Sequence, residues 1–230
     1  MKVKNIVLLI LGLFIIAAFT TGAYSYMNQG LKANKTQSES AAVTTRADAY
    51  VKQGLKASKT QSKSAALTTG ADSYVNQGFK AYKAHNYSSA LLLYDKALKL
   101  EPKNAQALNG KGVVLAFSGK PKEGLKYINR AIVVKPKYLT AYFNAGLANE
   151  LAHDYPAAIK AYKAVIASDP KNTWSYYGIA CAYAQMGDAL HATQYLTKAI
   201  ALDNNVKMDA RTEKDFDRIR KDKGFIKVIK

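Results

Sequence analysis

The chain has 230 residues, of which 49% are hydrophobic, and it carries 34 Lys and Arg against 16 Asp and Glu. The length allows one main domain with extensions rather than several globular domains, and the apolar fraction is sufficient for a packed core. The formal net charge of +18 makes anionic partners or surfaces candidates. The single cysteine, Cys181, excludes an intrachain disulfide and a thiolate metal cluster.

An apolar segment near the amino terminus indicates export. Lys2 and Lys4 form a short basic head, the run from Ile6 to Phe19 is almost wholly apolar, and Ala23 ends a stretch of small residues. The run is shorter than the roughly 20 residues that span a bilayer and fits the core of a signal peptide. We expect residues 1–23 to be a signal peptide cleaved near Ala23 or an uncleaved membrane anchor. Either would place the rest of the chain outside the cytoplasm.

Residues 24–70 contain a duplication with its own length. The segments 23–46 and 47–70 match at 16 of 24 positions and are rich in Ser, Thr, Lys and Gln. A unit of this length is too short for a pair of packed helices, and the composition is typical of a linker. We predict a weakly helical spacer, and the alternative is a pair of ligand-binding units.

The main part of the chain, residues 71–206, consists of four copies of one 34-residue pattern. The copies are 71–104, 105–138, 139–172 and 173–206, and they align without insertion or deletion. Small residues recur in three columns: Gly78, Gly112, Gly146 and Ala180; Ala90, Gly124, Ala158 and Ala192; Ala97, Ala131, Val165 and Ala199. Such columns let paired helices approach closely, and the fixed period is typical of a solenoid whose units pack against their neighbours.

Larger residues fill two further columns, and proline closes three of the copies. The columns are Tyr74, Leu108, Tyr142 and Tyr176, then Tyr94, Ile128, Tyr162 and Leu196, and the prolines are Pro102, Pro136 and Pro170. Together with the period, this pattern resembles tetratricopeptide repeat (TPR) proteins of the exported bacterial type. The resemblance implies a right-handed superhelical solenoid of four helix hairpins with a C-terminal helical cap. Together with the N-terminal signal or anchor helix predicted above, the expected fold class is all-α. It also implies a concave face that binds partner segments, and no catalysis.

Helical periodicity and turn residues predict two helices in each copy. The expected helices are 71–84 and 88–101, 105–118 and 121–134, 139–152 and 155–168, and 173–186 and 189–202. The turns between paired helices carry residues with turn and helix-capping chemistry, namely Asn86, Gly119-Lys120, Asp154 and Gly187-Asp188. His85 and His153 share one column at these turns, so we expect surface residues rather than ligands or general bases.

If the resemblance holds, the first helix of each copy lines the inner groove. Projection of the helical period gives the candidate partner-binding set: Val75, Asn76, Phe79, Tyr82, Asn109, Val113, Phe117, Phe143, Asn144, Leu147, Trp174 and Tyr177. The amides in this set could bind the backbone of a partner peptide while the aromatic rings bind its side chains. The same rings could instead be ordinary packing between repeats.

The resemblance also bears on which partner the groove accepts. Relatives that bind a C-terminal carboxylate use lysine, arginine and asparagine on these helices, whereas Val75, Phe79, Thr140 and Gly178 stand at such places here. Recognition of a carboxylate is therefore not expected. Cys181 is expected to be a packing residue, because no histidine or basic residue lies within two helical turns of it.

Charge is distributed unevenly along the copies. The first two copies carry twelve Lys and Arg against four Asp and Glu, and the last two carry four against five. Many lysines fall on second helices, where they could simply solubilise the outer face or could bind anionic lipid or cell-wall polymer. No nucleic-acid motif is present, and we expect no nucleic-acid partner.

The tail, residues 207–230, departs from the repeat and resembles the closing segment of bacterial TPR proteins. We expect Phe216, Ile219, Phe225, Ile226 and Ile229 to cover the last repeat as a cap. Asp215 and Asp217 are expected to be charged surface residues beside Arg218 and Arg220 rather than a metal site.

No nucleophile, base and orienting group converge in this sequence, and we expect neither a cofactor nor a metal. The sequence therefore predicts a non-catalytic protein–protein interaction scaffold in the cell envelope. The alternative is a binder of anionic envelope surfaces through the basic outer face.

Overall fold

The computed structural model describes residues 70–230. The predicted signal or anchor in 1–23 and the predicted spacer, apart from Gly70, lie outside the described residues. Within 70–230 the secondary structure is helical, without a strand. None of the helices in this range is long and apolar enough to cross a bilayer.

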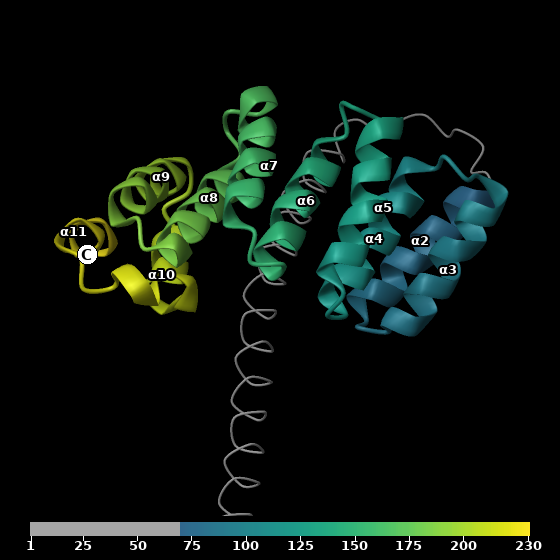
Figure 1. Ribbon diagram of the computed structural model, residues 1–230, viewed down its shortest axis with the longest axis horizontal. Coiled ribbons are helices and arrows are strands. Elements are labelled where there is room, and N and C mark those ends of the chain that lie inside the picture. Colours follow the sequence, from purple (N-terminus) through teal and green to yellow (C-terminus); the bar gives the residue numbers. More distant parts are fainter. Residues whose placement is uncertain (1–69) are drawn as a thin grey trace, which may run out of the picture. The chain divides into compact units, whose positions relative to one another are not determined.

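Eight helices form four consecutive hairpins (Figure 1). The pairs are α2 (Gly70–Lys83) with α3 (Tyr87–Leu100), α4 (Ala105–Phe117) with α5 (Pro121–Val134), α6 (Leu139–Leu151) with α7 (Tyr155–Ser168), and α8 (Thr173–Met186) with α9 (Ala189–Leu202). Each hairpin packs against the next, since α3 contacts α4, α5 contacts α6, and α7 contacts α8. The predicted all-α solenoid of four hairpins is confirmed, and the helix bounds differ from the expected ones by at most one residue.

First and second helices differ in how much of their surface is buried. The first helices α4, α6 and α8 are buried around most of their circumference, because they lie between their own partner helix and the hairpins on either side. The second helices α3, α5, α7 and α9 bury a narrow stripe spaced at helical intervals, such as Gly124, Ile128 and Ala131 of α5. A helix that is apolar on all sides is typical of the interior of a solenoid.

Side-chain caps define where most of these helices begin. Asn86, Asn104, Asp154, Asn172 and Asp188 each accept a hydrogen bond from the backbone N–H three residues later, at 2.9–3.1 Å. These bonds satisfy one of the N–H groups that every helix start leaves unpaired.

The glycine columns mark close helix contacts, as expected, and the contacts are of two kinds. In hairpins 1 and 3 the glycines face a tyrosine ring. A Cβ on Gly146 or Gly178 would lie 2.4 or 2.7 Å from the ring of Tyr162, and Cβ atoms on Gly78 and Gly110 would lie 3.0 and 2.4 Å from Tyr94. Each ring is thus held between the first helices of two successive hairpins. Burial raises the pKa of the Tyr94 phenol well above its ordinary value, with a smaller contribution from Tyr138.

In hairpin 2 the glycines face the backbone instead. A Cβ on Gly124 would lie 2.3 Å from the carbonyl oxygen of Gly112, and one on Gly112 would lie 2.6 Å from the carbonyl oxygen of Gly124 and from Cγ1 of Ile128. Hairpin 4 carries Ala180, Ala192 and Leu196 at the matching positions, all fully buried. The tyrosine of the odd hairpins is therefore replaced by an aliphatic residue in the even ones.

The turns inside the hairpins follow the same alternation. His85 and His153 have φ of 57° and 58° in hairpins 1 and 3, and Gly119 and Gly187 have φ of 83° and 81° in hairpins 2 and 4. Both histidines are exposed, as expected, and each ring lies beside the tyrosine two residues later. A non-glycine residue in this left-handed conformation is strained, because its Cβ approaches the backbone.

Three short elements, α10 (Val206–Thr212), the 3₁₀ helix η1 (Lys214–Ile219) and α11 (Lys223–Ile229), close the solenoid. Phe216 and Phe225 are fully buried with ring centroids 5.1 Å apart, and Phe216 contacts Tyr177 of α8 at 5.7 Å. The predicted helical cap is therefore present. The prediction that Asp215 lies on the charged surface of the cap is wrong. Asp215 is 7% exposed and accepts a hydrogen bond from Nε2 of Gln185 at 2.9 Å.

Several other cap residues lie where they were predicted. Arg220 does pair with Asp217, at 2.9 Å. Ile219 is buried and Ile229 is half-buried against the last repeat. Phe225, Val228 and Ile229 of α11 pack in the cluster of the last repeat and the cap, and Ile226 of the same helix is half-buried.

Candidate functional site

The twelve residues of the predicted partner-binding set fall into three groups by exposure. Phe143, Leu147 and Tyr177 are at most 1% exposed. The ring of Phe143 contacts that of Tyr162 edge-on at 5.4 Å, and Tyr177 contacts Phe216 of the cap in the same way. These three residues pack in the interior and are not accessible to a partner.

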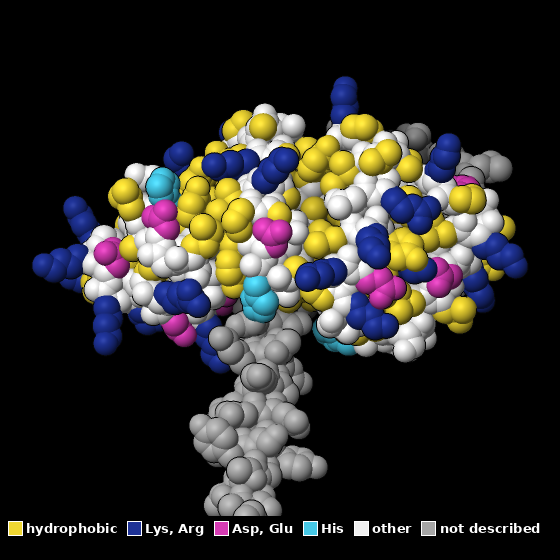
Figure 2. All heavy atoms as spheres, viewed as in Figure 1, with side chains coloured by type: hydrophobic (Ala, Val, Ile, Leu, Met, Phe, Trp, Pro, Cys, Tyr) yellow, Lys and Arg dark blue, Asp and Glu magenta, His cyan; other side chains and the backbone are white. Residues whose placement is uncertain are grey.

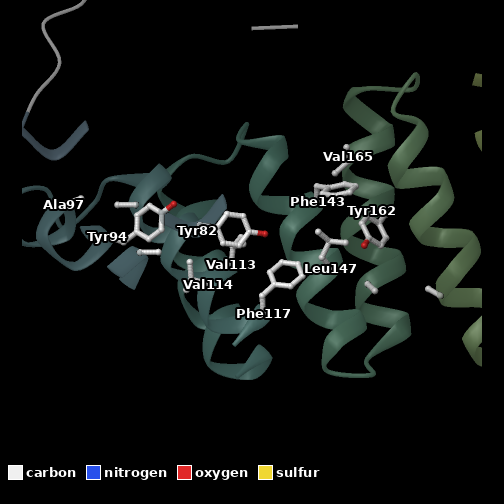
Figure 3. Close-up of a cluster of buried hydrophobic side chains, with 14 of the residues drawn as sticks. Tyr82, Tyr94, Ala97, Val113, Val114, Phe117, Phe143, Leu147, Tyr162 and Val165 are labelled. Atoms are coloured by element: carbon white, nitrogen blue, oxygen red, sulfur yellow. The ribbon is translucent and has the colours of Figure 1, made fainter. Parts of the chain in front are cut away.

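A second group lies at the boundary between interior and surface. Tyr82, Asn109, Val113, Phe117 and Asn144 are 6–9% exposed. Figure 3 shows Tyr82, Val113 and Phe117 close together, in the same hydrophobic cluster as Phe143, Leu147 and Tyr162. The ring of Tyr82 lies 6.2 Å from that of Phe117 and 6.5 Å from that of Phe79, so the three rings form one aromatic cluster.

The amides of this second group meet across two hairpins. Nδ2 of Asn144 on α6 donates a hydrogen bond to Oδ1 of Asn109 on α4 at 3.1 Å. Each amide uses one of its two functional ends in this bond. Nδ2 of Asn109 and Oδ1 of Asn144 are a donor and an acceptor that the bond leaves available, which is the combination that a peptide group requires.

The third group is accessible. Asn76 is exposed, and Val75, Phe79 and Trp174 are half-buried against the core. Trp174 contacts Tyr177 edge-on at 5.8 Å, and Nζ of Lys83 lies 5.9 Å from the ring of Phe79. The accessible aromatic residues therefore lie on α2 and α8, on either side of the amide pair on α4 and α6.

The sequence reasoning missed a buried carboxylate on the same helices. Glu150 of α6 is 7% exposed and follows Phe143 and Leu147 at helical spacing. The spacing of Phe143, Leu147 and Glu150 was visible in the sequence. It was overlooked because an acidic residue at the end of a helix is usually exposed.

Lysine and tyrosine side chains pair on the outer surface. Nζ of Lys111 lies 4.5 Å from the ring of Tyr127 and 2.5 Å from Oδ1 of Asp95, and Lys198 lies 5.3 Å from the ring of Tyr195. Burial disfavours the charge of Lys111, but its hydrogen bonds to Asp95 and Tyr127 outweigh burial and raise its pKa. These contacts order the long cationic side chains without burying them in the core.

Side chains that could bind a metal do not cluster in the described part of the chain. Among residues 70–230, no group of three or more His, Cys, Asp and Glu is placed to hold a metal ion. Cys181 is 1% exposed within the last hairpin, in keeping with a packing role.

Comparison with known proteins identifies the repeats. One family model described as Tetratricopeptide repeat matches residues 76–132 and 114–173, and another of the same description matches 175–206. Together these matches cover more than half of the chain.

Solved structures give the same result for the fold. The chain is similar to the MamA protein, with a TM-score of 0.58 and 22% identity over 69% of this chain and 89% of that one. It is also similar to pilF of Pseudomonas aeruginosa, with a TM-score of 0.60 and 19% identity over 69% of this chain and 71% of that one. A third similar structure is TTC0263, a TPR protein of Thermus thermophilus, with a TM-score of 0.57 and 18% identity over 70% of this chain and 86% of that one. At these identities the similarity concerns the fold alone.

One curated protein is also similar. Superkiller protein 3 of Schizosaccharomyces pombe is 27% identical over 107 residues, which is 46% of this chain and 8% of that protein. The chain thus spans a small part of that relative's length.

Proposed function

This chain belongs to the tetratricopeptide repeat family, and we propose that it is a non-catalytic scaffold that binds a segment of a protein partner along its first helices. TPR domains in general bind protein partners. The proposal adds a location on this chain: the amide pair of Asn109 and Asn144, with Phe79 and Phe117 on one side and Trp174 on the other.

The observation that carries the proposal is the hydrogen bond between Asn109 and Asn144. The bond fixes the orientation of both amides, so the remaining donor and acceptor are held in place before a partner arrives. A partner peptide group that donates to Oδ1 of Asn144 and accepts from Nδ2 of Asn109 would form two hydrogen bonds with little loss of side-chain entropy.

The accessible aromatic residues indicate the chemistry of the partner. Phe79 and Trp174 present apolar surface beside the amide pair, and aromatic residues of this kind often dominate binding energy at interfaces. Val75 and Phe79 stand where relatives that bind a C-terminal carboxylate carry polar or basic residues. The proposed partner segment is therefore internal to its chain, and it contributes aliphatic or aromatic side chains.

A crosslinking experiment tests the site. A photoreactive amino acid at Asn76, which is exposed on α2, identifies what binds the full chain in cells, and the binding constant of the identified segment is then measured for variants. We expect Asn144→Ala to weaken binding about tenfold, as the loss of one hydrogen bond and of the orientation of Asn109 implies. Trp174→Ala is expected to weaken it by a similar or larger factor.

Matched controls lie on the outer helices. Asn129 on α5 and Leu92 on α3 are exposed, so Asn129→Ala removes the same side chain as Asn144→Ala, and Leu92→Ala removes an apolar one, away from the proposed site. Equal binding by Asn144→Ala, Trp174→Ala and these controls would refute the site. Tyr177→Ala is unsuitable as a test because Tyr177 is fully buried beneath the cap, and its loss would disturb the fold.

We also propose that the scaffold works in the cell envelope, held there or exported by residues 1–23. The support is the basic head followed by the apolar run in the sequence. Mass spectrometry of the mature amino terminus, together with protease treatment of intact cells, tests this. Cleavage near Ala23 or an intact, externally accessible chain agrees with export, and an intact protein that resists protease until the cells are lysed contradicts it.

A further inference from the structure

The loops between hairpins bring the ends of the second helices to one edge of the solenoid. A Cβ on Gly70, the first residue of α2, would lie 3.4 Å from Cδ1 of Leu100, the last residue of α3. The start of a first helix and the end of its second helix are therefore neighbours. Because the hairpins repeat with the same direction, the end of α5 occupies the corresponding place in hairpin 2.

This edge exposes large aliphatic side chains where the first two hairpins end. Leu100 is 57% exposed, Val133 is 79% exposed and Val134 is 40% exposed. The corresponding positions of hairpin 3, Ala167 and Ser168, are small. Hairpin 4 carries Leu202, which is 41% exposed but is followed by Asp203 instead of by lysines.

Exposed lysines lie close in sequence to these aliphatic residues. The segments 99–103 and 133–137 contain four exposed lysines, Lys99, Lys103, Lys135 and Lys137, and a single acidic residue, Glu101. Glu101 is half-buried and accepts a hydrogen bond from Nδ2 of Asn104 at 2.9 Å. In Figure 2, hydrophobic and basic side chains lie next to one another along the upper rim, where α5 ends in Figure 1.

An aromatic residue completes the arrangement. Tyr138 is half-buried directly after these lysines, and Nζ of Lys135 lies 5.5 Å from its ring. Tyrosine prefers the headgroup level of a bilayer because its ring is apolar and its hydroxyl is polar. We name Leu100, Val133, Val134 and the four lysines the junction patch.

We propose that the junction patch binds the surface of a bilayer that contains anionic lipids. Leu100, Val133 and Val134 would enter the boundary between headgroups and acyl chains, while the lysines bind lipid phosphates. A soluble polyanion would use the lysines but would leave the aliphatic residues in water. The combination of both therefore favours a lipid surface over a polymer.

The course of the chain agrees with this assignment. The apolar run from Ile6 to Phe19 precedes the described residues, which begin at Gly70 beside Leu100. If that run holds the chain at a membrane, it keeps the junction patch within reach of the bilayer. The junction patch shares no residue with the proposed partner site, so this proposal goes beyond the scaffold function and does not depend on it.

Fluorescence on the full-length chain tests the proposal. In a Cys181→Ala background, a single cysteine is introduced by Val133→Cys and labelled with a fluorophore whose emission rises in apolar surroundings. Leu190→Cys is the matched control, because Leu190 is 66% exposed at the start of α9, which is the opposite end of a second helix. Both proteins are mixed with vesicles of phosphatidylcholine alone or with added phosphatidylglycerol.

The expected result is a rise in emission of about twofold or more at position 133 with the anionic vesicles, a smaller rise with the neutral ones, and no change at position 190. Adding Lys135→Gln and Lys137→Gln should remove most of the rise, while Lys122→Gln and Lys126→Gln, at the other end of α5, should leave it. Asn144→Ala should not affect it, which separates this test from that of the partner site.

Three outcomes would overturn the proposal. The first is unchanged emission at position 133 with both kinds of vesicle. The second is an equal rise at positions 133 and 190, because the amino-terminal segment would then hold the chain at the bilayer without orienting this edge. The third is a rise with a soluble anionic polymer, such as teichoic acid, and none with vesicles.

Discussion

Hairpins 1 and 3 differ from hairpins 2 and 4 in the side chain that packs between the first helices. In the odd hairpins a tyrosine ring, Tyr94 or Tyr162, lies between glycines of two successive first helices. In the even hairpins Ile128 or Leu196 takes that place, and in hairpin 2 the two helix backbones touch directly at Gly112 and Gly124. The backbone therefore repeats every 34 residues, while the side-chain packing repeats every two hairpins. A regular helix spacing does not require the same contacts in each unit.

Removing a clamped ring should have the largest effect on this comparison. Tyr162→Ala leaves a cavity between Gly146 and Gly178, and we expect a loss of about 4 kcal/mol in the free energy of unfolding. Leu196→Ala in hairpin 4 should cost about 3 kcal/mol, because a smaller side chain is lost. Urea denaturation followed by circular dichroism measures both.

A double variant sharpens that result. Gly146→Ala with Tyr162→Leu reproduces the Ala180 and Leu196 pair of hairpin 4 inside hairpin 3. If the two packing solutions are equivalent, the double variant should be more stable than either single variant. A loss equal to the sum of the single losses would show that the solutions cannot be exchanged.

Gly124, which faces a backbone, should tolerate a methyl group less well than Gly78, which faces a ring at a longer distance. Gly124→Ala places Cβ 2.3 Å from a carbonyl oxygen, which moves only if the helices separate, and we expect a loss of about 3 kcal/mol. In Gly78→Ala the nearest atom is a ring carbon at 3.0 Å, and the higher helix propensity of alanine offsets part of the clash. We expect a change of about 1 kcal/mol or less for Gly78→Ala in the same denaturation assay. Similar losses for both variants would contradict the distinction.

Substitutions at the turns of hairpins 4 and 3 should change stability in opposite directions. Nothing lies within 4 Å of a Cβ on Gly187, so Gly187→Ala introduces only the strain of a positive φ, about 1 kcal/mol of destabilisation. His153→Gly removes that strain, but it also raises the entropy of the unfolded chain and loses the contact with Tyr155 at 3.1 Å, so we expect the melting temperature to rise by about 1–2 °C. Destabilisation by His153→Gly would show that the contact and the added entropy together outweigh the strain.

The smallest effect concerns pH at the start of α9. The pKa of Asp188 lies below its ordinary value of 3.8, mainly because its carboxylate accepts a hydrogen bond from the backbone N–H of His191. Slight burial acts in the opposite direction, and the His191 side chain lowers the pKa further. Because this pKa is lower in the folded state, its stabilisation is present above the ordinary value and is lost as the pH falls through the folded value. Asp188→Asn should therefore have a lower urea midpoint than the wild type at neutral pH, and the two midpoints should converge in acid. Hairpin 1 has Asn86 at this position, so Asn86→Ser should give a change that is independent of pH.

Helix positions were predictable from the sequence because glycine, alanine and proline recur at constant spacing and because caps such as Asn86 and Asp154 precede second helices. The sequence did not predict which residues of the partner-binding set are buried and which are accessible. A helical projection assigns Asn144, Phe143 and Tyr177 to one face, but the depth of that face depends on the neighbouring hairpin and on the cap. Asp215 was misjudged for the same reason, since its partner Gln185 lies 30 residues earlier on α8. Long-range contacts of this kind leave no local pattern.

The clamped rings make the junctions between hairpins chemically unequal. Tyr94 ties hairpin 1 to hairpin 2, and Tyr162 ties hairpin 3 to hairpin 4, whereas hairpin 2 meets hairpin 3 through aliphatic residues such as Ile128 and Ala145. The hydrogen bond of Asn109 with Asn144 crosses this aliphatic junction. A segment bound to both amides would therefore brace the junction that lacks a tyrosine clamp, and hydrogen exchange should slow there more than at the other two junctions.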